Sequence, residues 1–192
     1  MKTDIILAGV GGQVILSIAA TIGMAAISND LHLKQAEVHG MSQRGGAVQS
    51  HLRLSSKPIA SDLIPKGSCD IILSVEPMES LRYVDFLHED AWIITNSTPF
   101  VNITDYPDVE DVIERIKSRK NTIILDADKL AKEVGSPRSS NIVALGAATP
   151  FIDIPYEAFE EAIRQIFMKK GERVIEANIK ALAAGRAVAD AR

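Results

Sequence analysis

The sequence predicts a three-layer α/β/α domain with a mostly parallel, Rossmann-like sheet. Short β-branched runs alternate along the chain with segments of helical period, which is the pattern of such a domain. The runs Ile71–Leu73 and Ile93–Ile94 are continuously apolar, as expected of strands covered by helices on both faces. A glycine-rich turn, Gly9–Gly12, follows the first apolar run and precedes a long helical segment, so the chain opens with a strand, a turn and a helix.

These patterns assign strands and helices along the whole chain. The expected strands are Asp4–Ala8, Lys34–Val38, Gln49–Leu54, Asp70–Ser74, Trp92–Thr95 and Thr122–Leu125. The expected helices are Gln13–Ser28, Pro77–Leu87, Val109–Arg119, Ala127–Val134, Asn141–Ala148, Tyr156–Met168 and Glu172–Ala189. Pro155 and Gly171 are the start and stop signals of the sixth helix. The last helix carries a narrow apolar stripe of Ile175, Ile179 and Leu182, which can pack on its own sheet or on a partner.

Length and composition suit one globular domain over residues 1–192. The chain has 192 residues and a mass of 20.8 kDa, with 46% apolar and 24% charged residues, so it can bury a core. The irregular connections at 96–108 and 136–140 are too short to separate two domains. The formal net charge of −4 leaves no basic excess for a phosphate backbone, so general nucleic-acid binding is not expected.

No targeting segment or membrane span is expected. The first apolar run breaks at Gly9, and its only basic flank is Lys2, which argues against a signal peptide. The apolar stretch Val14–Ile27 is interrupted by polar residues and falls short of the ~20 residues that cross a bilayer. The single cysteine, Cys69, excludes an internal disulfide, a four-thiolate zinc site and an iron–sulfur cluster, and it fits a reducing cytoplasm.

The glycine turn is a candidate anion or cofactor site formed by Gly9, Gly11, Gly12 and Gln13. Glycines let the chain turn sharply and bring backbone N–H groups close to an anion at a helix start. A dinucleotide fingerprint would need glycine at position 14, where this chain has Val14. An acidic ribose partner is also missing, because Asp30 is expected in a turn and not at a strand end. A tight turn that binds nothing is at least as good an interpretation.

The most unusual segment is the polar stretch from Glu37 to His51, which follows the second expected strand. Arg44 can hold a carboxylate or phosphate with two hydrogen bonds, and Gly45-Gly46 lets the backbone approach such a ligand. His39 can donate or carry a proton near neutral pH. The alternative, a buried or inter-subunit polar network without chemistry, is the simpler interpretation. As an interface or ligand-side loop the stretch comprises Glu37, His39, Met41, Ser42, Gln43, Arg44, Gly45 and Gly46.

Neither a catalytic residue nor a metal site follows from this stretch. Ser42 and His39 lack a third partner and the strained turn of a hydrolase nucleophile. His39 and His51 lack the third and fourth ligands of a metal site.

The glycine turn and the polar stretch together resemble a known family. The segments Gly9–Gln13 and Glu37–Gly46 are similar to those of the gamma-type module of 2-oxoacid:ferredoxin oxidoreductases. Further similar positions extend the resemblance over nearly the whole chain, at 70–79 with Arg82, Asn96, 126–127, 130–131, 139–147 and 178–185. The run His39–Gly46 is the specific part, and it favours the aryl-2-oxoacid branch, the indolepyruvate ferredoxin oxidoreductases. Val14 departs from the family turn, which usually ends in glycine.

The resemblance implies one subunit of a hetero-oligomer. Such assemblies decarboxylate a 2-oxoacid, transfer the acyl group to coenzyme A and pass electrons to ferredoxin. Thiamine diphosphate, magnesium and 4Fe–4S clusters belong to the larger alpha subunit, so this chain is expected to bind none of them and to be inactive alone. It would shape the coenzyme A side of the site through Arg44 or the Gly11-Gly12 backbone.

Other functions stay open at this point. The chain can be the gamma subunit of another 2-oxoacid:ferredoxin oxidoreductase, a free-standing α/β protein that binds a nucleotide or coenzyme A, or a structural subunit that orders the alpha chain. A stable partner with iron–sulfur colour is expected only for an oxidoreductase subunit. Calorimetric titration of the isolated chain with coenzyme A separates a binding protein from a structural subunit.

Overall fold

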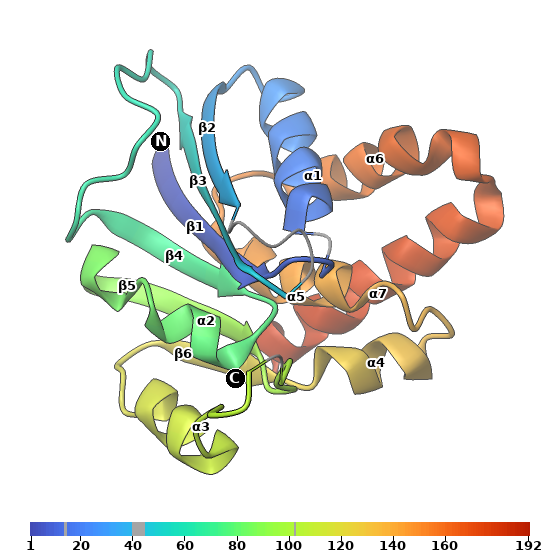
Figure 1. Cartoon of the computed structure of the whole chain (residues 1–192). Coiled ribbons are helices and arrows are strands. Elements are labelled where there is room, and N and C mark those ends of the chain that lie inside the picture. The colour runs from blue at the N-terminus through green and yellow to red at the C-terminus, as the bar shows by residue number, and fades with distance from the viewer. Residues whose placement is uncertain (14, 40–44, 102) are drawn as a thin grey trace.

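The structure, a computed structural model, describes residues 1–13, 15–39, 45–101 and 103–192. Within these residues a six-stranded sheet lies between two layers of helices, with the strand order β2-β3-β1-β4-β5-β6 (Figure 1). The strands are β1 (Lys2–Val10), β2 (His32–His39), β3 (Ala47–Ser55), β4 (Cys69–Ser74), β5 (Leu87–Asn96) and β6 (Thr122–Leu125).

All the described strands except β3 run in one direction. The neighbours β1, β4, β5 and β6 are parallel, whereas β3 is antiparallel to both β1 and β2. The register of β1 against β3 runs from Lys2 opposite Ser55 to Val10 opposite Ala47. Residues 40–46 alone connect β2 to β3, which is too short for a parallel crossover and explains the antiparallel hairpin. The predicted α/β/α fold with a mostly parallel sheet is confirmed.

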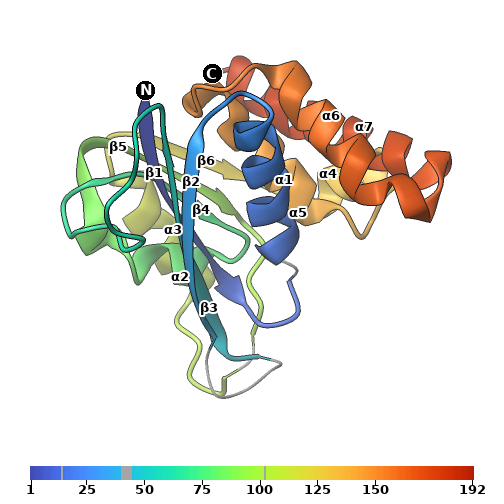
Figure 2. The same ribbon diagram turned by 90° about the horizontal axis from the view of Figure 1, so that it is seen from above.

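Helices cover both faces of the sheet (Figure 2). One layer contains α1, α4, α5, α6 and α7, and the other contains α2 and α3. The bounds are α1 (Ile15–Ile27), α2 (Pro77–Leu81), α3 (Val109–Lys117), α4 (Ala127–Glu133), α5 (Ser140–Ala148), α6 (Tyr156–Phe167) and α7 (Glu172–Asp190). Short 3-10 turns follow α2, α5 and α6.

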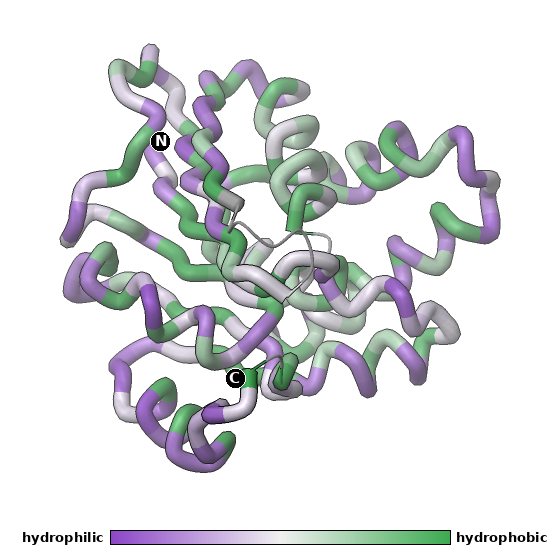
Figure 3. The backbone as a smooth tube through the Cα atoms, in the orientation of Figure 1, coloured by the Kyte–Doolittle hydropathy of each residue, from purple (hydrophilic) through white to green (hydrophobic). Residues whose placement is uncertain are grey.

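Alternate residues of β1 enter two separate cores. Ile5 and Leu7 belong to a large cluster beneath the five-helix layer, whereas Ile6 packs with Ile72 and Cys69 on the opposite face. Burying one such aliphatic side chain completely stabilises the fold by about 1.5–3 kcal/mol. Figure 3 shows the resulting concentration of apolar residues along the central strands. Burial on both faces explains the continuous apolar runs of the sequence.

The helix α5 is buried along almost its whole length, and glycines let α7 cross it closely. Every residue from Asn141 to Ala148 is buried. A Cβ atom at Gly146 would lie 2.0 Å from the carbonyl oxygen of Leu182, and one at Gly185 would lie 1.8 Å from that of Val143. The last helix therefore packs on α5, and not directly on the sheet as one of the two predicted alternatives had it. The other alternative, packing on a partner, stays a prediction.

Two neighbouring elements differ from the prediction: a helix is shorter than expected, and the strand that follows it is longer. The helix expected at Pro77–Leu87 ends at Leu81, and a 3-10 turn follows. Tyr83, at φ −113° and ψ 12°, has left the helical conformation. Leu87 already pairs with β4, so sheet formation extends the strand expected at Trp92–Thr95 in both directions.

The helices α6 and α7 extend beyond the sheet as a hairpin (Figures 1 and 2). Its tip carries mostly hydrophilic residues (Figure 3). Over the ranges that the structure covers, none of the helices combines the length and apolar composition that crossing a membrane requires.

Candidate functional site

The carboxyl ends of β1, β4, β5 and β6 meet at one edge of the sheet, because these strands are parallel. After β1 the chain enters α1 on one face, and after β4 it enters α2 on the opposite face (Figure 2). The connections therefore diverge between β1 and β4, the place where open α/β sheets bind ligands.

A cleft of about 380 Å³ opens at this edge, and we call it the carboxyl-edge cleft. It is lined by Gln13, Val75, Asn96, Thr98, Pro99, Phe100, Asp128, Lys132 and Ser140. Two amides, two hydroxyls, a carboxylate and an ammonium group thus face one space, together with the apolar surface of Phe100. Such a set can hold a polar or anionic ligand by hydrogen bonds.

Gln13, a member of the predicted anion site, ties the ends of two strands together. Its Oε1 accepts a hydrogen bond from the N–H of Val10 at 2.8 Å, and its Nε2 donates to the carbonyl of Val75 at 3.3 Å. Gly9 is required beside it, because a Cβ there would lie 2.5 Å from Cγ2 of Val75 and 2.7 Å from Cδ1 of Ile15. These contacts fix Gln13 at the wall of the cleft.

Backbone hydrogen bonds join the glycine turn to the polar stretch. The N–H of Gly11 donates to the carbonyl of Gly46 at 2.8 Å, and the N–H of Gly45 donates to the carbonyl of Gly11 at 3.2 Å. Gly12 (φ 104°) and Gly45 (φ 82°) adopt conformations that side chains disfavour. The N–H of Gln13 also bonds within the turn, so an anion there would rely partly on other donors. The predicted anion role of the turn stays a prediction.

The other residues of the polar stretch are only partly described. Glu37 lies in β2, where its Oε2 accepts a hydrogen bond from Nε2 of Gln35 at 3.3 Å. His39 is the last residue of β2 and is paired with Val48. Their role as an interface or ligand-side loop stays a prediction. The same holds for Met41, Ser42, Gln43 and Arg44, which lie outside the described residues. Val14, where the family turn usually has glycine, also lies outside them.

Asn96, the last residue of β5, forms hydrogen bonds to the start of α4 at the wall of the cleft. Its Nδ2 donates to Oδ2 of Asp128 at 2.8 Å, and its Oδ1 accepts from the N–H of Ala127 at 3.0 Å. Asp126 caps α4 by accepting from the N–H of Lys129 at 2.9 Å. The side-chain amide of Asn96 and the N-cap Asp126 together fix the start of α4 at the cleft. Asp128, in the first turn of α4, is fixed there with it.

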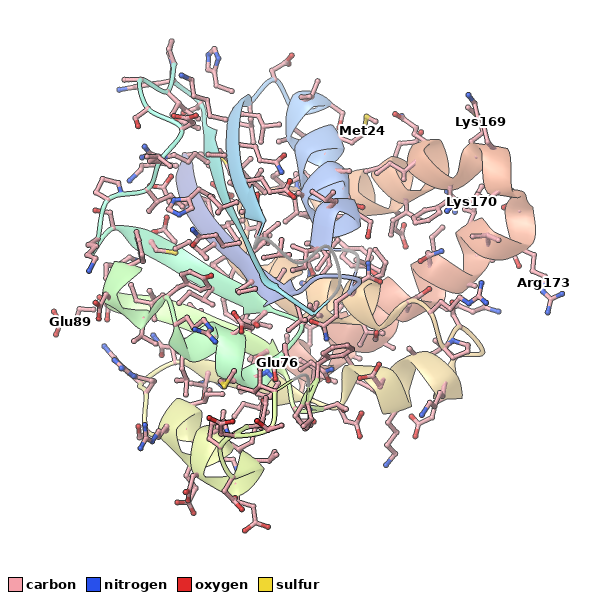
Figure 4. All side chains as sticks on the ribbon, viewed as in Figure 1. Met24, Glu76, Glu89, Lys169, Lys170 and Arg173 are labelled. Atoms are coloured by element: carbon pink, nitrogen blue, oxygen red, sulfur yellow. The ribbon has the colours of Figure 1, made fainter. Side chains whose placement is uncertain are left out.

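Glu76 is a buried carboxylate that holds the outer wall of the cleft (Figure 4). It caps α2 by accepting the N–H of Glu79 at 2.8 Å. Its Oε1 accepts from the N–H of Phe100 at 3.3 Å and from the hydroxyl of Tyr106. Burial, followed by the Glu76 carboxylate, raises the pKa of Tyr106 above its usual range, so the hydroxyl keeps its proton. The connection 97–108 is therefore anchored at two points.

Sequence reasoning assigned no role to Glu76, Asp128 or Lys132. A polar residue directly after the carboxyl end of a parallel strand is a signal that could have found Glu76 after β4. Asp128 and Lys132 lie on one face of α4, four residues apart, but only the placement of α4 beside β5 shows that they line the cleft.

Cys69 and His51 are buried structural residues. Burial raises the pKa of the Cys69 thiol to about 12, so this thiol is protonated near neutral pH. His51 accepts a hydrogen bond from the N–H of Ile64 through Nδ1 at 3.0 Å. Among the described residues no three His, Cys, Asp or Glu side chains are grouped as metal ligands. A single buried thiol also does not fit a 4Fe–4S cluster, which needs four thiolates.

The fold and the cleft define a Rossmann-like α/β module with an open cleft at the carboxyl edge of its sheet. The profile of the family described as "Pyruvate ferredoxin/flavodoxin oxidoreductase" matches residues 4–188. The chain belongs to this family.

Two curated relatives are similar to the chain over nearly their full length. The chain is 32% identical to "Indolepyruvate oxidoreductase subunit IorB" of Archaeoglobus fulgidus, with 96% of this chain and 94% of the relative covered. It is 34% identical to the protein of the same name from Pyrococcus horikoshii, with 95% and 93% covered.

Solved structures share the fold. The gamma subunit of a keto/oxoacid ferredoxin oxidoreductase from Geobacter sulfurreducens superposes with a TM-score of 0.71 at 25% identity, covering 99% of both chains. The 2-oxoglutarate:ferredoxin oxidoreductase of Magnetococcus marinus gives a TM-score of 0.79 at 24% identity and covers 100% of this chain. The chain spans only 31% of that larger chain.

Proposed function

We propose that the chain, as a single gamma-type domain over residues 1–192, is the beta subunit of an indolepyruvate ferredoxin oxidoreductase. The complex would oxidatively decarboxylate arylpyruvates to aryl-acetyl-CoA and reduce ferredoxin. The observation that carries this proposal is the 31–34% identity to four relatives named indolepyruvate oxidoreductase subunits, over about 95% of the chain. Relatives named for 2-oxoglutarate or ketoisovalerate are 25–29% identical, which makes a gamma subunit for another 2-oxoacid the second candidate.

The proposed partner is a larger alpha subunit in a hetero-oligomer. Thiamine diphosphate, magnesium and 4Fe–4S clusters supply the decarboxylation and electron-transfer chemistry, and we place them on that subunit. The donor set of this chain supports the division, because Cys69 is its single thiol. The single thiol supports a place in the reducing cytoplasm. The net charge of −4 supports a subunit that binds neither nucleic acid nor membrane. Ferredoxin would be reached through the complex.

Coenzyme A is the proposed cosubstrate whose side of the site this chain shapes. The Magnetococcus structure contains 2-oxoglutarate, coenzyme A and succinyl-CoA. In the carboxyl-edge cleft, Lys132 offers a positive charge and Gln13 and Asn96 offer amides, a set compatible with phosphate or amide groups of a ligand. Arg44 directly precedes Gly45, which is bonded to the glycine turn at the same edge.

Reconstitution with the alpha subunit tests the proposal. The complex and the separate chain are assayed for reduction of a low-potential dye with indolepyruvate, 2-oxoglutarate or pyruvate, each with and without coenzyme A. Coenzyme A-dependent reduction with indolepyruvate by the complex alone is the expected result. A preference for 2-oxoglutarate would select the second candidate. A chain that co-purifies with no subunit and binds coenzyme A calorimetrically would be a free-standing binding protein.

A further inference from the structure

A second cavity, of about 650 Å³, lies beside the start of α5, and we call it the hairpin cavity. Ser140 lines the carboxyl-edge cleft, whereas its neighbours Ser139 and Asn141 line the hairpin cavity. The other walls come from α1 and from the hairpin of α6 and α7. Its volume falls in the range of about 300–1,000 Å³ that small-molecule sites occupy.

Three exposed basic residues line this cavity, and Figure 4 shows that the Arg173 side chain points outward from the hairpin. Arg138 comes from the connection before α5, and Lys170 and Arg173 come from the tip of the hairpin. Among the described residues none of the three forms an ion pair, and neither Asp nor Glu lines the cavity. In a chain of net charge −4, three positive side chains at one cavity are a local excess. They match a ligand that carries two or more negative charges.

The floor of the hairpin cavity is a fixed polar network. The hydroxyl of Ser139 donates to Oδ1 of Asn178 at 2.9 Å and lies 2.6 Å from the hydroxyl of Ser136. Asn178 in turn donates through Nδ2 to the carbonyl of Val174 at 2.8 Å. Ser139 and Asn178 are 4% and 5% exposed, so these bonds hold α7 against the start of α5. The cavity is therefore preformed, and the hydroxyl protons of Ser136 and Ser139 are used within its floor.

One wall of the cavity is apolar. Ile166 and Phe167 from α6 face Val174 and Ala177 from α7. The Nζ atom of Lys170 lies 5.3 Å from the centre of the Phe167 ring, so a charged group and an aromatic surface are adjacent. Figure 4 shows Lys170 between the two helices, whereas Lys169 points outward. The cavity thus offers an aromatic surface beside its cations.

We propose that the hairpin cavity binds a nucleotide-like ligand. Its phosphates would contact Arg138, Lys170 and Arg173, and its ring would pack against Phe167. The inference does not depend on the proposed function and concerns a site separate from the carboxyl-edge cleft. Free nucleotides and the nucleotide end of a larger cofactor share this chemistry.

Calorimetric titrations of the full chain, with any subunit that co-purifies, test the site. The probes are ADP, pyrophosphate and adenosine, and the expected order of affinity is ADP, then pyrophosphate, then adenosine, because phosphate charge and ring contribute together. Lys170→Ala should weaken ADP binding about tenfold. The matched control Lys169→Ala removes the same charge one residue away and should change the affinity less than about twofold.

A second pair of variants tests the cavity without altering charge. Ala177→Trp fills the hairpin cavity and should abolish ADP binding, whereas Ala183→Trp on the exposed face of α7 should leave it intact. Thermal unfolding verifies that each variant is folded. If Ala177→Trp does not fold, the comparison of Lys170→Ala with Lys169→Ala decides whether ADP binds in the hairpin cavity.

Competition with coenzyme A distinguishes the two sources of the ligand. Displacement of ADP by coenzyme A assigns the cavity to the nucleotide end of a cofactor, and lack of displacement assigns it to a free nucleotide. Either result supports the site. The proposal is overturned by the lack of ADP binding at millimolar concentration, or by equal losses of affinity in Lys169→Ala and Lys170→Ala.

Discussion

His51 shows at the scale of a residue how burial decides protonation. The side chain is 5% exposed, accepts a hydrogen bond from Ile64 and packs edge-on against Phe86. Burial, and then the charge of Arg53, lower the pKa of His51 below its ordinary value of 6.5. The folded protein therefore keeps this ring neutral at a pH where the unfolded chain takes up a proton.

Acidification is expected to destabilise the fold through His51. Between pH 6.5 and the lowered pKa of the folded state, the unfolded chain binds more protons, so the free energy of unfolding falls as the pH drops through that window. His51→Asn keeps an acceptor for the N–H of Ile64 but does not titrate, so its stability should depend less steeply on pH. Urea unfolding of both proteins near neutral pH and below pH 6 measures the difference, and identical pH dependence would contradict the role of His51.

Tyr106 is expected to hold the outer wall of the carboxyl-edge cleft. Tyr106→Phe removes the hydroxyl that donates to the buried carboxylate of Glu76, and a hydrogen bond to a charged group contributes about 1.5–3 kcal/mol. Amide hydrogen exchange should therefore accelerate in the connection 97–108 and stay unchanged in the sheet. The control Thr104→Val removes only an exposed hydroxyl bond to Asp105. Equal acceleration in both variants would show that Glu76 does not anchor this wall.

At the glycine turn, the local backbone conformation was predictable from the sequence, whereas the long-range contacts were not. The sequence predicted a sharp turn that needs glycine, and Gly12 at φ 104° confirms it. Asp30, expected in a turn, has a φ of 57°. The bonds from Gly11 to Gly46 and from Gln13 to Val75 were not predictable, because they depend on which strands flank β1. The local conformation was therefore predictable, but the contacts that give Gln13 its place in the cleft were not.

At the scale of elements, Gly185 is expected to be essential for the crossing of α7 over α5. Intrinsic helix propensity favours Gly185→Ala by about 1 kcal/mol. Packing opposes it, because the new Cβ would lie 1.8 Å from the carbonyl oxygen of Val143 and the two helices would have to separate. We expect Gly185→Ala to lower the free energy of unfolding by at least about 2 kcal/mol.

Denaturant unfolding measures the change in the free energy of unfolding for Gly185→Ala. A decrease shows that the packing clash outweighs helix propensity, and an increase shows the reverse. The control Ala183→Gly, on the exposed face of the same helix, should cost only the propensity difference of about 1 kcal/mol. A stabilised Gly185→Ala protein would show that the close crossing is not required.

Periodicity predicted the helices and strands because most of them bury a regular face. It was wrong between Leu81 and Leu87, where the chain leaves the helix, forms a 3-10 turn and pairs with β4 from Leu87. The stripe Ile175, Ile179 and Leu182 indicated an apolar face of α7, but the face it meets depends on Gly146 in a different helix. Local patterns thus predicted the elements, and tertiary contacts decided their ends and partners.

At the scale of the whole molecule, strand order decides which residues share the carboxyl-edge cleft. β1 lies between β3 and β4, so the glycine turn meets Gly46 on one side and Val75 on the other. The sequence predicted a mostly parallel sheet, a glycine turn after the first strand and a polar stretch after the second. The order of the strands across the sheet is a property of the assembled core. Asn96 and Glu76 were both among the positions of the resemblance, but without a role, and Lys132 was not among them. Their place at the cleft became visible only in the folded chain.

Arg44 provides the last prediction, which concerns the complete oxidoreductase. Gly45, directly after Arg44, is bonded to Gly11 at the carboxyl edge, where four parallel strands end. If this edge faces coenzyme A in the complex, Arg44→Ala should raise the KM for coenzyme A about tenfold, the effect of losing one charge-assisted hydrogen bond, and change kcat less. Arg119→Ala, an exposed arginine after α3, is the matched control and should leave both constants unchanged. An unchanged coenzyme A requirement in the Arg44 variant would remove this residue from the ligand side and favour its role in contacts between subunits.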